Sequence, residues 1–129
     1  MGQKFLLDSN TVIDYTSQLL PSSATSAIDN IINEAFIISI VVKIEVLGFN
    51  GQSDKMKKLE RFLQFAEILP LNDDIADKTI ELRKKHKKLA LGDAIIAATA
   101  SVNNFTLITR NIADFKNIAT LKLINPYDL

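Results

Sequence analysis

Apolar residues recur along this chain in short unbroken runs that are separated by longer, periodic stretches. The runs are KFLLD at residues 4–8, FIISI at 36–40, EILPL around Ile68 and Leu69, FTLIT at 105–109 and LKLI at 121–124. Short apolar runs of this kind, bounded by polar or turn-forming residues, predict buried strands. The chain is therefore expected to contain five strands.

The stretches between these runs carry apolar residues at a spacing of three and four, which predicts helices. We expect helices over residues 9–20, 22–35, 41–48, from Lys57 to about 66 and from Asp73 to Lys88, with a further helix around Asp93 and a short turn-rich piece at 111–115. Residues 50–55 are polar and predict a loop. Strands that alternate with helices favour parallel pairing. Residues 1–129 are expected to form one domain, a three-layer α/β/α sandwich with a central, mainly parallel sheet.

The composition narrows the function by exclusion. Fifteen basic and fifteen acidic residues cancel, so any electrostatic attraction to nucleic acid must come from a local patch. The absence of cysteine excludes disulfides and thiolate metal sites, and a single histidine makes a Ser-His-Asp triad unpromising. Residues 1–7 lack the form of a signal peptide, and no apolar run is long enough to cross a bilayer. We expect a cytoplasmic protein that does not enter the membrane.

Several carboxylates stand where a solvated charge is not expected. Asp8 closes the first strand, Glu45 and Asp93 lie among apolar helical neighbours, and Asn111 and Asp114 follow the strand FTLIT. Taken singly, Asp8 could be a helix N-cap, Asp93 an acid that favours the helix dipole, and Asn111 a turn residue. Functional groups of parallel α/β folds gather at the carboxyl ends of the strands, so these residues are predicted to cluster.

Clustered carboxylates repel one another, and they need shared protons or a cation to be stable at neutral pH. A set of oxygen ligands without histidine or cysteine suits Mg²⁺ or Mn²⁺ better than zinc. Such an ion typically meets phosphate groups, so the cluster points to phosphoryl-transfer chemistry.

Four motifs in order, LLDSNTVID, SIVVKIEVLGF, LGDAIIAATA and LITRNIADF, resemble the PIN-domain family, in particular its VapC-like toxin ribonucleases. The resemblance covers essentially the whole chain. It implies an α/β/α fold with a parallel sheet and cleavage of RNA by an endonuclease that depends on Mg²⁺ or Mn²⁺. It also implies a small antitoxin as partner and a homodimer as the usual assembly.

The resemblance also assigns roles to individual positions. Asp8, Glu45 and Asp93 match three acids of the family and are expected to bind the metal and act in catalysis. Thr109 matches a small hydroxyl residue at the end of the fourth strand. Ser9 and Asn10 are expected to orient ligands beside Asp8.

The fourth acid of the family is the place where this sequence departs from the pattern. Many relatives carry an aspartate two residues after the threonine, where this chain has Asn111. Asn111 could supply a neutral oxygen to the metal, and Asp114, three residues further on, could supply the missing charge to catalysis.

A basic run, RKKHKK, precedes Asp93 and contains Lys84, Lys85, Lys87 and Lys88. These lysines and Arg110 are candidate contacts to RNA phosphates. The alternative is a solvated helix end whose cations favour the dipole. His86, in the same run, is expected to be exposed and not to bind metal.

Two other classes of function compete with the ribonuclease. The first is a PIN-like module that binds RNA or protein with weak or no nuclease activity, an alternative raised by Asn111. The second is a small-molecule phosphatase or a phosphoacceptor domain. LLDSN lacks the second aspartate of the phosphatase pattern, and Arg110 stands where the acceptor pattern has a lysine.

Overall fold

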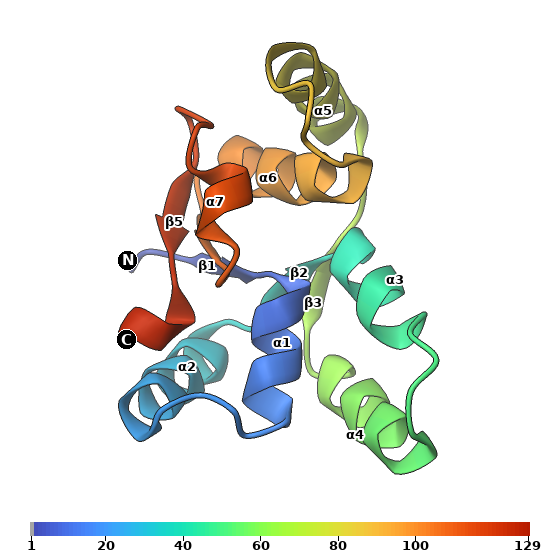
Figure 1. Cartoon of the computed structure of the whole chain (residues 1–129), viewed down its shortest axis with the longest axis vertical. Helices are drawn as coiled ribbons and strands as arrows, with labels where there is room; N and C mark the ends of the chain where they lie inside the picture. The colour runs from blue at the N-terminus through green and yellow to red at the C-terminus, as the bar shows by residue number, and fades with distance from the viewer. Residues whose placement is uncertain (1) are drawn as a thin grey trace.

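The computed structural model describes residues 2–129. It contains five three-residue strands (Figure 1), and each hydrogen-bonded pair of strands is parallel. They are β1 (Phe5–Leu7), β2 (Ile37–Ser39), β3 (Glu67–Leu69), β4 (Thr106–Ile108) and β5 (Lys122–Ile124). β4 pairs with β1 on one side and with β5 on the other, and β2 pairs with β3. The predicted α/β fold with a parallel sheet is confirmed.

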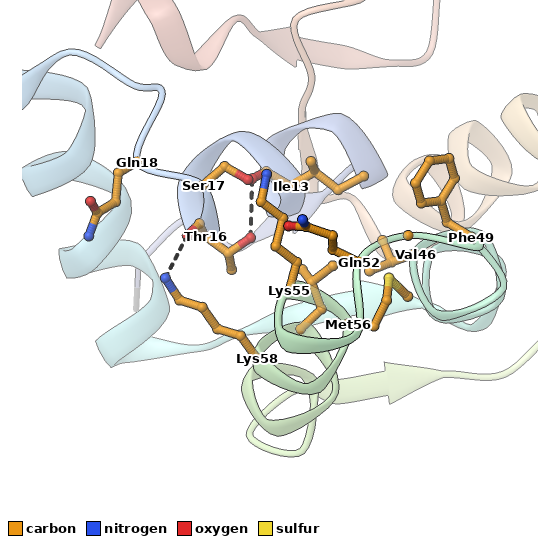
Figure 2. A pocket seen from close by; sticks show the side chains of 12 residues that line it. Ile13, Thr16, Ser17, Gln18, Val46, Phe49, Gln52, Lys55, Met56 and Lys58 are labelled. Atoms are coloured by element: carbon orange, nitrogen blue, oxygen red, sulfur yellow. Dashed lines mark hydrogen bonds between the residues drawn. The ribbon is translucent and has the colours of Figure 1, made fainter.

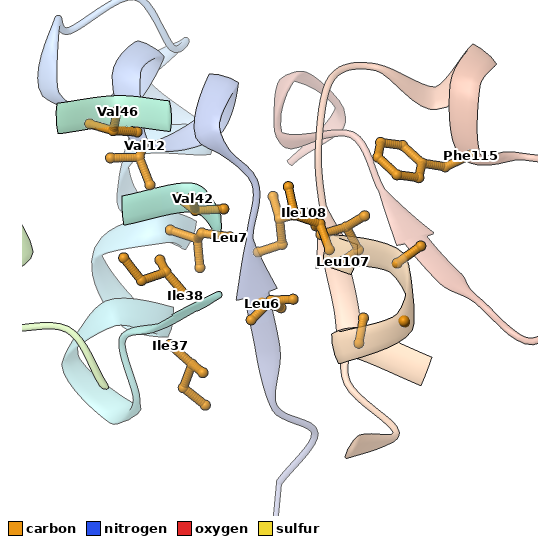
Figure 3. Packing of buried hydrophobic residues seen from close by; sticks show 14 of the residues in the cluster. Leu6, Leu7, Val12, Ile37, Ile38, Val42, Val46, Leu107, Ile108 and Phe115 are labelled. Atoms are coloured by element: carbon orange, nitrogen blue, oxygen red, sulfur yellow. The ribbon is translucent and has the colours of Figure 1, made fainter. Parts of the chain in front are cut away.

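The strands form two hydrogen-bonded groups, although the sequence led us to expect one sheet. β1 contacts β2, but no backbone hydrogen bond joins these two strands anywhere in residues 2–129. We call this boundary the seam. Side chains close it: Leu6 and Leu7 of β1 belong to the same buried cluster as Ile38 of β2 and Leu107 of β4 (Figure 3). Apolar packing therefore holds the two groups together.

Helices cover both faces of the strands (Figure 1). They are α1 (Ser9–Thr16), α2 (Ser22–Glu34), α3 (Ile40–Leu47), α4 (Ser53–Leu63), α5 (Asp73–Lys85), α6 (Leu91–Asn103) and α7 (Ile112–Phe115), and a 3₁₀ turn, η1 (Pro126–Asp128), follows β5. α5 packs along α6, and α1 contacts both α3 and α4. Within residues 2–129, none of the helices has the length and apolar character that crossing a membrane requires.

Three predicted boundaries are wrong. α1 ends at Thr16 and not near residue 20, because Gln18 adopts a left-handed conformation with φ of 60°. α4 begins at Ser53, inside the stretch expected to be a loop. α5 ends at Lys85, because His86 has φ of −123° and ψ of 84° and so leaves the helical region.

Candidate active site

Asp8 lies directly after β1 and is almost fully buried, with 4% of its surface exposed. It is the N-cap of α1 and accepts a hydrogen bond from the Ser9 backbone N–H at 2.8 Å. Thr109 Oγ1 donates to Asp8 Oδ2 at 2.7 Å, and Asn10 Nδ2 donates to the same oxygen at 3.2 Å. The capping role therefore exists, and the same carboxylate also faces a pocket.

That pocket, which we call the acid pocket, has a volume of about 340 Å³ and brings together residues from opposite ends of the chain. Its lining consists of Asp8, Ser9, Asn10, Ile13, Glu45, Asp93, Arg110 and Asn111. Asp8 and Glu45 arrive from the two sides of the seam, and Asp93 comes from the first turn of α6. The three acids selected from the sequence thus lie at one place.

The carboxylates of the acid pocket influence one another electrostatically. Burial, together with the charges of Asp8, Glu45 and Asp114, raises the pKa of Asp93 to about 6. Burial also raises the pKa of Asp8, helped by the charge of Glu45 and opposed by the hydrogen bonds from Thr109 and Ser9. Each carboxylate makes the ionised form of its neighbours less stable, so the pocket stores electrostatic repulsion between its acids.

Glu45 is exposed, although its helical neighbours are apolar. Ser9 Oγ donates a hydrogen bond to Glu45 Oε1 at 2.5 Å, which links α1 to α3 across the seam. Gly92 leaves room for this carboxylate, because a Cβ atom at that position would lie 3.2 Å from Glu45 Oε2 and 3.6 Å from Val41 Cγ1. A small residue before Asp93 is therefore part of the shape of the site.

Asn111 and Asp114, the two candidates for the fourth position, are bonded to each other. Asn111 Nδ2 donates to Asp114 Oδ2 at 2.6 Å, and the Asn111 backbone N–H donates to Thr109 Oγ1 at 3.1 Å. Asn111 lines the acid pocket, whereas Asp114 lies on α7 and lines the neighbouring pocket, which shares Asp93. Both residues therefore lie beside the acid pocket, Asn111 in its wall and Asp114 next to it.

The donors of the acid pocket fit a hard divalent cation by their chemistry. Its three acids offer only oxygens, and a cation would offset both the burial and the repulsion that raise the pKa values of Asp8 and Asp93. Within residues 2–129, no three acidic, histidine or cysteine side chains already stand close enough to form a complete ligand cluster. The pocket supplies the right groups, and an ion would have to draw them together.

Asp14 is a buried acid that the sequence interpretation missed. It is 2% exposed and accepts hydrogen bonds from Arg110 Nη1 at 2.6 Å and from the Tyr127 hydroxyl at 3.0 Å. The Arg110 backbone N–H donates to Asn10 Oδ1 at 3.1 Å. The criterion that selected Asp93, a charge among apolar helical neighbours, could not find Asp14, because the positions three and four residues away, Asn10, Thr11, Ser17 and Gln18, are all polar. The Arg110 guanidinium, predicted to contact RNA, is bound to this acid.

The basic run divides into two parts. Lys84 and Lys85 are exposed on the last turn of α5, and Lys85 Nζ lies 3.5 Å from the Glu81 carboxylate. Lys87 and Lys88 follow the helix and line a second pocket of about 380 Å³, beside Asp93. His86 lines this pocket as well and is half-buried, so its predicted exposure is wrong.

A third pocket, of about 550 Å³, lies between α1, α3 and α4 and is mainly apolar (Figure 2). Val46, Phe49, Met56 and Leu59 contribute to its wall, and 67% of the Phe49 surface is exposed. Ile13 lines both this apolar pocket and the acid pocket. A molecule bound in one could therefore reach the other.

Known proteins resemble this chain over most of its length. Ribonuclease VapC2 of Rickettsia felis is 32% identical over 130 residues, which cover 94% of this chain and 96% of that protein. Ribonuclease VapC10 of Mycobacterium tuberculosis is 30% identical over 89 residues, which cover 66% of each chain. For VapC10, the match thus spans about two thirds of the relative's length.

Solved structures show the same fold. VapBC2 from Rickettsia felis, crystallised with a DNA fragment from its promoter, superposes with a TM-score of 0.82 at 25% identity and covers 95% of this chain and 98% of that chain. A toxin-antitoxin complex from Klebsiella pneumoniae superposes with a TM-score of 0.74 at 30% identity and covers 98% of this chain and 100% of that one. The model of the PIN domain matches residues 5–121. The family resemblance is thereby confirmed: this chain belongs to the PIN domain family.

Proposed function

We propose that this protein is a metal-dependent endoribonuclease and the toxin of a type II toxin-antitoxin pair. The observation that carries the proposal is the meeting of Asp8, Glu45 and Asp93 in one open pocket, where burial and mutual repulsion raise the pKa of Asp93 to about 6. Strongly perturbed carboxylates in a cleft are typical of catalytic sites. Membership of the PIN domain family and two relatives named as ribonucleases support the same reading.

In this proposal Asp8, Glu45 and Asp93 hold one Mg²⁺ or Mn²⁺, and Asn111 adds a neutral oxygen. When bound, such an ion would lower the pKa of water and neutralise charge on a phosphodiester. Attack of the water oxygen on phosphorus, with cleavage of the bond to the 3′-oxygen, would leave 5′-phosphate and 3′-hydroxyl ends. Asp114 contributes its negative charge at the rim, where it is bonded to Asn111. The carboxylates would bind and position the ion, and the phosphodiester that is to be cleaved would lie in the same pocket.

The neighbouring polar side chains would keep these carboxylates in place. Thr109 and Asn10 donate to one oxygen of Asp8, and Ser9 donates to Glu45. Each bond leaves other lone pairs of its carboxylate available, because an ionised carboxyl group accepts several hydrogen bonds or ligands. Ser9, Asn10 and Thr109 therefore serve as positioning residues.

The proposed partner is a small antitoxin that binds the apolar pocket between α1, α3 and α4 and reaches the acid pocket past Ile13. The exposed Phe49 supports a protein partner, since large apolar side chains in an open pocket typically mark an interface. Two of the solved relatives are VapBC2 and a toxin-antitoxin complex. The proposed assembly of the chain itself is a homodimer.

The test is cleavage of a mixed pool of transfer and ribosomal RNA by the purified, antitoxin-free chain, with Mg²⁺ or Mn²⁺ and then with EDTA. Asp93→Asn and Glu45→Gln should abolish cleavage, because each removes one charge from the ligand set. Asp77→Asn, an exposed acid on α5 that lines none of the three pockets, is the matched control and should cut at the parental rate. Cleavage by Asp93→Asn at the parental rate would refute the site.

The second candidate function is an RNA- or protein-binding module, and the observation that favours it is Asn111 in place of the fourth acid. An amide is neutral and so brings no charge to the pocket, and the Asn111 Nδ2 already donates to Asp114. A well-folded chain that binds RNA without cutting it under any metal condition would select this second function.

A further inference from the structure

The second pocket, beside the acids, is lined by a set of groups suited to a nucleotide. It is formed by His86, Lys87, Lys88, Leu89, Ala90, Asp93, Ala113, Asp114 and Asn117. We propose that this pocket binds the nucleotide next to the scissile phosphate of an RNA strand, with Lys87 and Lys88 on its phosphate and His86 on its base. The inference rests on the proposed ribonuclease function and names how that same site holds its substrate.

Local folding explains why only part of the basic run faces this pocket. α5 stops at Lys85, and the Leu89 backbone N–H donates to the His86 carbonyl at 3.0 Å, which closes a tight turn. Leu89 is 7% exposed and anchors the turn in the core. Lys87 and Lys88 therefore sit on a short, anchored connection directly before α6, and this connection holds them beside Asp93.

The charges of Lys87 and Lys88 are available for a ligand. Neither forms an ion pair in the part of the chain that the structure describes, residues 2–129, whereas Lys85 pairs with Glu81. The ammonium groups of Lys87 and Lys88 form no ion pair with Asp93 or Asp114, although both acids line the same pocket. A phosphate group that bridges the lysines would satisfy them and place its strand next to the acid pocket, because Asp93 lines both cavities.

The remaining lining suits the sugar and base. At about 380 Å³ the cavity lies in the size range of small-molecule sites. His86 offers an aromatic face, Asn117 an amide that can donate and accept, and Leu89 with Ala113 an apolar wall. Unpaired bases are commonly stacked on aromatic side chains and hydrogen-bonded at their edges.

The experiment measures binding separately from cleavage. A short fluorescent single-stranded oligoribonucleotide of mixed sequence is titrated with the full chain in EDTA, by anisotropy, over a range of salt concentrations. Each phosphate contact to a single strand contributes about −0.7 to the slope of log affinity against log salt, so Lys87→Gln with Lys88→Gln should make that slope about 1.4 units shallower and weaken binding about tenfold at low salt. His86→Ala should weaken binding by about tenfold with the slope unchanged.

The matched control is Lys84→Gln with Lys85→Gln, which removes the same charge one turn upstream, outside the pocket. The proposal requires a clearly smaller loss of affinity and slope in this control. If the two double variants lose equal affinity and slope, RNA is attracted by the basic run as a whole, and the proposal of a specific nucleotide pocket is refuted. A parental chain that binds no RNA would refute it as well.

Cleavage assays on the same proteins separate the two hypotheses. A parental chain that cuts RNA, together with a Lys87→Gln, Lys88→Gln variant that binds and cuts equally well, would refute the subsite and leave the ribonuclease standing. A parental chain that cuts no RNA in Mg²⁺ or Mn²⁺ would refute the ribonuclease itself, whatever the binding data show.

Discussion

Replacement of Asp93 by asparagine should stabilise the metal-free protein at the same time as it abolishes activity. In the folded chain the pKa of Asp93 is raised from the ordinary 3.8 to about 6, first by burial and then by Asp8, Glu45 and Asp114. The folded state therefore holds this proton more tightly than the unfolded state. Asp93 therefore does not lower the free energy of unfolding below about pH 3.8. The free energy of unfolding falls as the pH rises from about 3.8 to about 6, and it stays at the lower value above that pH.

The size of the effect follows from that shift after a correction for solvent. At 1.36 kcal/mol per pKa unit, the full shift corresponds to about 3 kcal/mol. Asp93 is only half-buried, and water screens part of the repulsion, so we expect about 1 kcal/mol at pH 8. For a chain of this length, that difference corresponds to an increase of about 3 to 5 °C in Tm.

The assay is thermal unfolding of the parent and of Asp93→Asn in EDTA, between pH 4 and pH 8, with Asp77→Asn as the control. Asp93→Asn should be more stable than the parent at pH 8. The difference should disappear near pH 4, where the Asp93 carboxyl of the folded parent is protonated and therefore as neutral as asparagine. Added Mg²⁺ should raise the Tm of the parent more than that of the variant, because a ligand stabilises the state that binds it. A variant that is equally or less stable than the parent at pH 8 would refute the account of stored repulsion.

Three further substitutions test the surroundings of the acids. Thr109→Val should lower the free energy of unfolding at neutral pH by about 1.5 to 3 kcal/mol, measured by urea titration, because Asp8 loses a hydrogen bond to its ionised form. Gly92→Ala should slow RNA cleavage while leaving stability unchanged or raised by up to about 1 kcal/mol, since alanine favours the helix but crowds Glu45; parental cleavage would contradict this. Arg110→Gln should lower the free energy of unfolding by about 1 to 2 kcal/mol, because the guanidinium binds a buried carboxylate, and RNA affinity in anisotropy should stay nearly unchanged. A large loss of affinity would instead support the predicted contact between Arg110 and RNA.

The features that the sequence predicted are those with a local signal. Apolar runs located all five strands. Asp8 was selected by its position at the end of the first strand, and Glu45 and Asp93 by their apolar helical neighbours. The start of α4 was missed because Ser53, Asp54 and Lys55 are exposed and add nothing to an apolar period. The end of α5 was placed too late, because lysine favours helix and the tight turn that is anchored by burial of Leu89 is a tertiary effect.

Contacts between distant residues gave no such signal. The bonds from Arg110 and Tyr127 to Asp14 join residues that lie 96 and 113 positions apart. The pairing of the strands is a property of the same kind. A run of apolar residues indicates that a strand is buried but does not say which edge forms hydrogen bonds, so the seam between β1 and β2 could be found only in the structure.

The seam gives the metal-free molecule a mechanical weak point at the place where the chemistry is proposed. The hydrogen-bonded pairing that ties β1 to β4 stops short of β2, and the Ser9–Glu45 bond is a side-chain tie that crosses at the level of the acids. A cation held by Asp8 on one side and Glu45 on the other would crosslink the two groups of strands, which share no backbone hydrogen bonds with each other. Backbone amides along β2 and β3, as well as those of β1, should then exchange with solvent more slowly once the ion is bound, far beyond the residues that touch it.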